Sequence, residues 1–147
     1  TNETIKATGR LNIQVIGPDD MIKDEQTVDN LVVSVGLNFI ASRIRDASST
    51  VMSHMAVGSG TAPAASGNTA LGTELGRVAL TSTTATNNAV AFVATFGAGV
   101  GTGAVTEAGL FNASTAGTML CRTVFGVVNK EAADTMSITW TVTIGAA

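Results

Sequence analysis

The sequence predicts an all-β, mainly antiparallel fold of the β-sandwich or jelly-roll-like type, with one short α-helix near residues 35–46. Residues 136–144 alternate strictly between apolar and small polar side chains, which is the pattern of a strand with one buried and one solvated face. Short runs of this kind recur at roughly 8–12-residue spacing with turn residues between them, which is typical of sandwiches. We therefore expect one β-sandwich domain over residues 1–147, beginning with a hairpin at residues 1–28.

The strand at residues 136–144 is the most regular element of the sequence. Its apolar face carries Trp140, the only tryptophan in the chain. The neighbours expected for this tryptophan are Phe92, Phe96 and Val124 or Phe125. The other face carries Thr139 and Thr141, whose β-branched side chains suit a pleated surface. These two threonines are predicted to meet either solvent or another subunit.

The chain is poor in charge. Of its 147 residues, 45% are hydrophobic and only 13% are charged, which is roughly half the charged share of an ordinary globular chain. Such a surface is typical of a protein that other protein partly covers, and a neutral, threonine-rich domain without a partner is the alternative. The net charge of −3 and the lack of basic patches interleaved with aromatic residues argue against nucleic acid as a partner.

Membrane and disulfide features are absent from the sequence. No apolar run approaches the roughly 20 residues that a membrane helix needs, and the net negative charge disfavours an anionic membrane surface. Residues 1–6 are polar and indicate no secretion signal. Cys121 is the only cysteine, so no internal disulfide is expected, which fits folding in a reducing compartment.

The first third of the chain predicts a hairpin followed by a short strand. Residues 10–16 and 21–28 form the expected strands, around turn residues 17–20. A second turn is expected at Asp29 and Asn30, before a short apolar strand that ends at Val33.

The period of the apolar residues then changes from that of a strand to that of a helix, over residues 35–46. Ser34 is the expected N-cap, and Arg43 and Arg45 lie at the end where cations suit the helix dipole. Gly36 weakens the first turn. We expect this helix to plug an open end of the sandwich.

The rest of the chain predicts five more strands before the one that carries Trp140. They cover residues 51–57, 77–80, 90–96, 105–112 and 119–128. The expected connections include a small-residue loop at 58–67, a helical turn within 68–76 and a polar connection at 81–88. The strand at 119–128 is apolar on both faces, so it should lie in the centre of a sheet or be covered by a neighbouring subunit.

Motifs for catalysis, metal binding or phosphate binding are weak. The glycine-rich run 97–103 lacks the following Lys-Ser/Thr pair and helix of a phosphate loop, so a hairpin tip is the better interpretation. His54 is the only histidine and no G-x-S-x-G motif accompanies it. The acidic residues at 19–25 lack the spacing of a calcium loop. We expect no catalytic residue, no cofactor, no metal and no small-molecule substrate.

Glu107 stands out because it lies alone in an apolar strand. A carboxylate in such a place needs a partner, and Arg77 or Arg122 could supply it. A general acid is the functional alternative, but no second carboxylate lies near it in the sequence. We therefore predict a structural ion pair, within a subunit or across an interface.

Three stretches together resemble small structural proteins of tailed bacteriophages. They are residues 29–41, residues 55–65 with 68–75, and residues 105–112 followed by 130–134 and the Trp140 strand. Proteins of this kind include capsid decoration (cement) proteins and parts of tail fibres and baseplates. Residues 107–111, Glu-Ala-Gly-Leu-Phe, also resemble a motif in tail-fibre N-terminal regions.

The resemblance implies a structural virion protein that is not an enzyme. A single compact domain suits a decoration protein better than a fibre, and binding only the assembled capsid stabilises that state by mass action. The expected partners are the major capsid protein and copies of the chain itself, as a dimer or trimer. The expected location is the capsid exterior, after synthesis in the host cytoplasm. A tail-fibre, adaptor or baseplate component is the alternative. The candidate structural or interface residues are Glu107, Arg77, Arg122, Trp140, Thr139 and Thr141.

Overall fold

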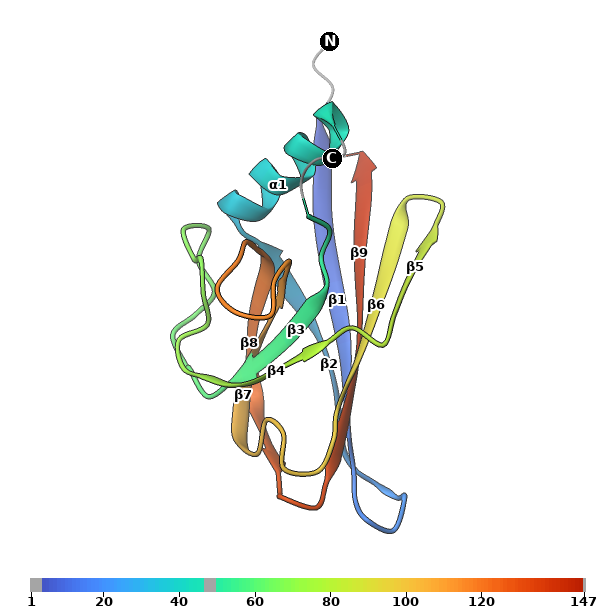
Figure 1. Cartoon of the computed structure of the whole chain (residues 1–147), viewed down its shortest axis with the longest axis vertical. Coiled ribbons are helices and arrows are strands. Elements are labelled where there is room, and N and C mark those ends of the chain that lie inside the picture. The colour runs from blue at the N-terminus through green and yellow to red at the C-terminus, as the bar shows by residue number, and fades with distance from the viewer. Residues whose placement is uncertain (1–3, 47–49, 147) are drawn as a thin grey trace.

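The computed structural model describes residues 4–46 and 50–146, which form nine strands and one helix (Figure 1). In chain order these are β1 (Ile5–Ile16), β2 (Ile22–Val32), α1 (Ser34–Arg45), β3 (His54–Gly58), β4 (Glu74–Ala79), β5 (Ser82–Thr86), β6 (Ala89–Phe96), β7 (Gly103–Phe111), β8 (Met119–Lys130) and β9 (Thr135–Ala146). The prediction of a mainly antiparallel β fold with one short helix is confirmed.

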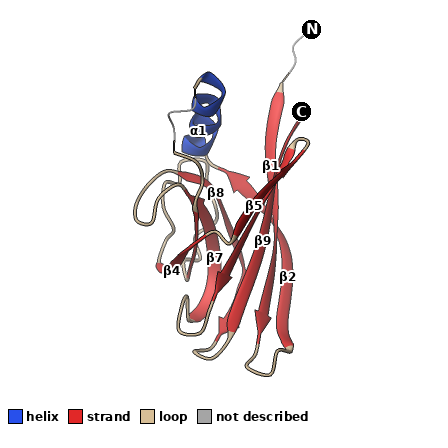
Figure 2. Cartoon of the chain, turned by 45° about the vertical axis from the view of Figure 1, so that its right-hand side comes forward, coloured by secondary structure: helices blue, strands red, loops and turns tan. Residues whose placement is uncertain are grey.

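The strands form one curled, half-barrel-like sheet, so the predicted two-sheet β-sandwich or jelly roll is wrong (Figure 2). The strand order is β4-β3-β7-β8-β2-β1-β9-β6-β5, and every neighbouring pair is antiparallel. β2 joins the two halves. The residues of β2 from Ile22 to Asn30 pair with β1, and its last two residues, Leu31 and Val32, pair with β8. One strand thus belongs to both halves, and the sheet curls around the core instead of dividing.

Two expected connections are strand instead. Asp29 and Asn30 continue β2, because Asp29 pairs with Arg10 of β1 at 3.0 Å and Asn30 faces the core. The polar connection expected at residues 81–88 contains β5, which pairs with β6. Cross-strand partners override the turn preference of short polar residues at both places. The helical turn expected within 68–76 is also absent, and β4 begins there at Glu74.

Helix α1 lies against β8 at one end of the curled sheet (Figure 2). Its N-cap is Val33, not the expected Ser34, and the Ser34 N–H donates to the carbonyl of Ser66 at 2.8 Å. Gly36 has a packing role, because a Cβ at this position would collide with the carbonyl oxygen of Leu120. A glycine that weakens the helix locally therefore allows it to approach the sheet closely.

The core lies on the concave side of the sheet. Leu11, Trp140 and Phe92 sit side by side on β1, β9 and β6, and Trp140 is fully buried. Its indole Nε1 donates to Asn30 Oδ1 at 2.8 Å, so its polar atom is satisfied. Of the other expected neighbours, Phe96 and Phe125 belong to this core, whereas Val124 lies outside it.

The first half of β8 is buried on both faces, as its apolar sequence predicts. β8 lies between β7 and β2, so its central position is confirmed. Its outer face belongs to a second apolar cluster that contains Phe111 and Met119, and Leu71 packs on this cluster from the loop between β3 and β4. We call this segment, residues 59–73, the covering loop. The chain itself therefore covers this part of β8, and a neighbouring subunit is not needed for its burial.

Candidate functional site

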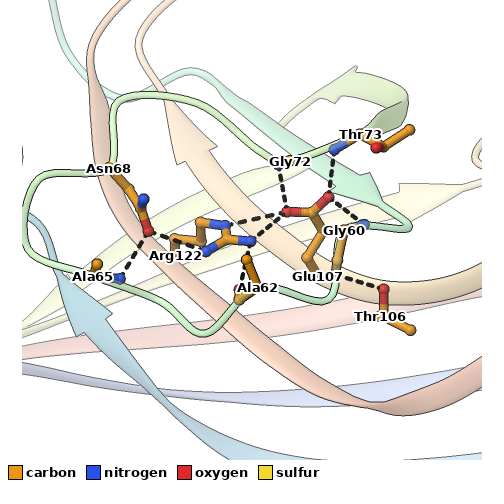
Figure 3. Close-up of polar contacts among 9 residues, drawn as sticks. All are labelled: Gly60, Ala62, Ala65, Asn68, Gly72, Thr73, Thr106, Glu107 and Arg122. Atoms are coloured by element: carbon orange, nitrogen blue, oxygen red, sulfur yellow. Dashed lines mark hydrogen bonds and ion pairs between the residues drawn. The ribbon is translucent and has the colours of Figure 1, made fainter.

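A buried carboxylate anchors the covering loop to the outer face of the sheet (Figure 3). Glu107 lies on β7 and its side chain is fully buried. It accepts five hydrogen bonds, from Gly60 N at 2.6 Å, Gly72 N at 2.8 Å, Thr73 N at 2.8 Å, and Arg122 Nε and Nη2 at 3.1 and 2.9 Å. The three backbone donors come from both ends of the loop, so one side chain fixes where the loop leaves and rejoins the sheet.

Arg122 extends the same network into the middle of the covering loop. It lies on β8, beside Glu107 on the neighbouring strand, and only 2% of its side chain is exposed. Besides the carboxylate, it donates to the carbonyl of Ala62 and to Asn68 Oδ1, each at 3.0 Å. Thr106 adds a hydrogen bond from its hydroxyl to the carbonyl of Gly60 at 2.8 Å. The network thus satisfies a buried ion pair with the polar groups of one loop.

The electrostatics of Glu107 favour the charged form. Burial raises the pKa of this carboxyl group, but the hydrogen bonds from Thr73, Gly72, Arg122 and Gly60 outweigh it, and the pKa lies below its ordinary value of 4.5. A general acid near neutral pH needs a raised pKa and a route to its substrate. The pKa of Glu107 is lowered, and both of its carboxylate oxygens accept internal hydrogen bonds. Glu107 therefore meets neither requirement. Its geometry serves to hold the loop.

Arg77, the other arginine considered as a partner for Glu107, lies elsewhere. It pairs with Glu74 at 2.7 Å and donates to the carbonyls of Ala113 and Ala116. Its guanidinium group stacks over the ring of Phe111, 3.8 Å from the centroid. Arg77 therefore caps the outer apolar cluster and ties the turn between β7 and β8 to β4.

Thr139 and Thr141 lie on the convex face of the sheet, opposite the core face of Trp140. They belong to a continuous surface on β5, β6 and β9, three strands without a single charged residue. We call this surface the neutral face. By strand alternation and register, it consists of Ser82, Thr84, Thr86, Ala89, Ala91, Val93, Thr95, Ser137, Thr139, Thr141 and Thr143. Charged side chains adjoin this face on the neighbouring strand β1, where Lys6 pairs in register with Gly145, and Arg10 pairs with Thr141 and forms an ion pair with Asp29 of β2.

The metal-ligating side chains, Cys121 and His54 were the other candidates for a site. Within residues 4–46 and 50–146, no three His, Cys, Asp or Glu side chains are placed to hold a metal ion. Burial raises the pKa of Cys121, so its thiol is a packing group. The imidazole Nδ1 of His54 lies 2.7 Å from the hydroxyl of the adjacent Ser53. Among residues 4–46 and 50–146, α1 is the one helix, and it is not long and apolar enough to span a membrane.

Sequence reasoning identifies Glu107 as needing a partner and offers Arg77 or Arg122 for it, but it does not choose between them and misses the backbone donors. Gly60 leaves room for the carboxylate, since a Cβ at this position would collide with it. The sequence signal is an isolated glutamate together with a small-residue loop that has no charge of its own. This signal indicates that the glutamate needs partners, but only the pairing of β3, β7 and β8 brings the loop to it.

Acid is expected to remove the stabilisation that the Glu107 carboxylate provides. Because its pKa is lower in the folded protein than its ordinary value of 4.5, this contribution is complete above that value and is lost as the pH falls through the folded pKa. Glu107→Gln removes the titration, so the difference in unfolding free energy between wild type and variant should narrow in acid. Urea unfolding from neutral pH to about pH 3, followed by Trp140 fluorescence, measures this difference.

Two other carboxyl groups also have lowered pKa values, Asp134 because of the hydrogen bond from Lys23 and Glu25 because of those from Gln14 and Asn12. Both groups are present in the two proteins, so their contributions cancel in the difference. A difference that stays constant from neutral pH into acid would show that the charge of Glu107 does not stabilise the fold.

Comparisons of the chain with models of protein families, with curated proteins and with solved structures find no match.

Proposed function

We propose that this chain is a non-enzymatic structural protein of a tailed-phage virion, which binds the outside of the assembled capsid and bridges capsomers as a decoration protein. The observation that carries the proposal is the neutral face, which spans three strands without a charged residue. Its partners would be the major capsid protein and copies of the chain itself. The resemblance to phage virion proteins supports the same class, and it covers residues 29–41, 55–65 with 68–75, and 105–112 followed by 130–134 and the Trp140 strand.

The neutral face is well suited to protein contact. The buried centres of protein interfaces are depleted of charged residues, because each ion that loses its water without a partner costs several kcal/mol. Thr139, Thr141 and Thr143 also line one side of a groove of about 980 Å³ along β1, whose lining includes the charged residues Lys6, Arg10 and Asp29. Hydroxyl and methyl groups in such a groove offer both hydrogen bonds and apolar contact to a protein surface. The neutral face is therefore better suited to contact with the capsid shell than to contact with solvent.

The Glu107 network supports a structural role rather than a catalytic one. Both groups of this buried ion pair bond to internal partners, so the pair holds the loop rigidly and does not present the carboxylate to a substrate. A decoration protein gains from this rigidity, because a surface that keeps its shape loses less conformational entropy on binding.

The location of the chain in the particle tests the proposal. Cryo-electron microscopy of the virion should show it on the capsid exterior, and a quantitative gel of purified virions should give a copy number close to that of the major capsid protein. Density found only at the tail, with a handful to a few dozen copies, would replace the decoration role with a tail-fibre, adaptor or baseplate role. Absence from the virion would exclude both.

Lysine on the neutral face is expected to weaken capsid binding. Thr139→Lys and Thr141→Lys should each weaken binding to the assembled shell at least about tenfold, because an unpaired charge would lose its water in the contact. Co-sedimentation with capsids lacking the protein measures the binding. The matched control is Thr115→Lys, which adds the same charge to an exposed turn away from this face. Full binding by both variants would show that the neutral face is not the contact.

A further inference from the structure

The strand at one edge of the sheet is open. Among residues 4–46 and 50–146, β5 pairs with β6 alone, and it forms the end of the strand order, on the right of Figure 1. All five of its residues, Ser-Thr-Thr-Ala-Thr, are exposed, and none is charged or a proline. A strand edge presents a row of unpaired N–H and C=O groups, and exposed edges usually carry charge, proline or a bulge that prevents pairing with another chain.

The opposite edge of the same sheet has such protection. β4 carries the Glu74–Arg77 ion pair, and its register with β3 shifts between Val57 and Gly58. Its Gly76 also lies close to Gly101 of the turn between β6 and β7. One edge of the sheet is therefore blocked by charge, irregularity and packing, whereas β5 has neither charge nor proline to block pairing.

The hairpin between β5 and β6 determines which backbone groups point outward. Its turn has two residues, Asn87 and Asn88, with Asn87 at a φ of 54°, so the flanking Thr86 and Ala89 form a hydrogen-bonded pair. Antiparallel pairs alternate between bonded and non-bonded positions. The N–H and C=O groups of Thr83 and Ala85 therefore point away from β6, towards the open side.

We propose that β5 pairs antiparallel with β5 of a second copy of the chain, about a two-fold axis that passes beside Thr84. In this register Thr83 faces Ala85 of the second copy, and Ala85 faces Thr83. Both are the residues with outward backbone groups, so the two pairs form four N–H···O=C bonds without a change in either subunit. The strand is thus self-complementary, as an isologous interface requires.

A second copy fits this edge better than an unrelated chain does. The strand brings no charge to meet another charge, and the two neutral faces continue into one another across the axis. Thr84 lies opposite its own copy, and threonine pairs across antiparallel strands are favourable. On the concave side, Thr83, Val90 and Ile144 line an apolar groove of about 600 Å³ that reaches the open edge. The added strand would extend the wall of this groove. The inference goes beyond the virion role and does not rest on it.

A proline at an outward N–H tests the pairing. The full-length wild type should form dimers in sedimentation equilibrium across a concentration series. Ala85→Pro removes one outward N–H from each copy and should raise the dissociation constant at least about tenfold, while an edge strand tolerates the proline. Ala85→Ser is the control, since it keeps the N–H and should keep the dimer. A wild type that stays monomeric at its highest soluble concentration would overturn the proposal, as would an Ala85→Pro protein that dimerises normally.

Charges at the axis give a test that does not depend on proline. Thr84→Lys and Thr84→Glu each place like charges opposite one another, so each variant alone should be monomeric. A mixture of the two variants should recover the dimer, because lysine then faces glutamate. Thr84 is exposed, so circular dichroism should match the wild type, and the free energies of unfolding should agree within about 0.5 kcal/mol at a concentration where both proteins are monomeric. Dimers in each single variant, or no recovery in the mixture, would place the contact elsewhere.

Discussion

Glu107→Ala is expected to lower the free energy of unfolding by about 3–5 kcal/mol, which is the cost of removing one partner from a buried ion pair. The substitution leaves the Arg122 guanidinium group buried without its counter-ion. It also removes the acceptor of three backbone N–H groups, on Gly60, Gly72 and Thr73. Each orphaned donor adds to the cost unless water reaches it. The covering loop should therefore detach from β7 before the rest of the sheet unfolds.

Urea unfolding followed by Trp140 fluorescence measures the global loss, and hydrogen exchange in residues 59–73 measures the local one. Glu131→Ala is the control, because Glu131 is 79% exposed and lies 3.7 Å from Lys23, so its loss should cost about 0.5 kcal/mol or less. If Glu107→Ala costs no more than this control, the network does not hold the loop.

Trp140→Ala is expected to lower the free energy of unfolding by about 3–5 kcal/mol, the range for a large aromatic residue removed from a core. Trp140 is fully buried between Leu11 and Phe92 on the neighbouring strands. The alanine variant leaves a cavity there, and Asn30 Oδ1 loses the indole N–H that it accepts. Asn30 Nδ2 already lacks a protein partner among the described residues, so this amide would become wholly unsatisfied.

The only tryptophan is lost in this variant, so unfolding is followed by circular dichroism. Thr139→Ala, one residue away on the convex face, is the control and should cost about 1 kcal/mol or less. In contrast to Glu107→Ala, the loss should appear as reduced protection throughout β1, β9 and β6 and not in the covering loop alone. If Trp140→Ala unfolds with the same free energy as Thr139→Ala, the core must rearrange to fill the cavity and Trp140 does not stabilise the fold as expected.

Local periodicity predicts much of this fold correctly. The alternation in residues 136–144 identifies the buried face of β9, with Trp140 inside and Thr139 outside. The change of period after Val33 identifies the helix, which the structure begins at Ser34. The isolated Glu107 predicts an ion pair, because the cost of burying a lone carboxylate is a property of the residue and its strand alone.

The same reasoning does not predict which strands pair with one another across the chain. Whether the strands form one sheet or two depends on which of them pair. No local sequence pattern indicates that Leu31 and Val32 pair with β8. The strand Ser82–Thr86 has no buried residue, so it lacks the alternation that identifies a strand and is predicted as a connection. The choice of Arg122 over Arg77 likewise depends on which strand lies beside β7.

The sequence therefore determines which side chains of this protein must be buried, because apolar patterning and the cost of burial act residue by residue. The tertiary structure decides what they are buried against. It closes the strands into one curled sheet, brings the covering loop to Glu107 and leaves β5 open at the edge. These outcomes depend on strand partners far apart in the chain, because the pairing of all nine strands decides which of them lie at the edges of the sheet.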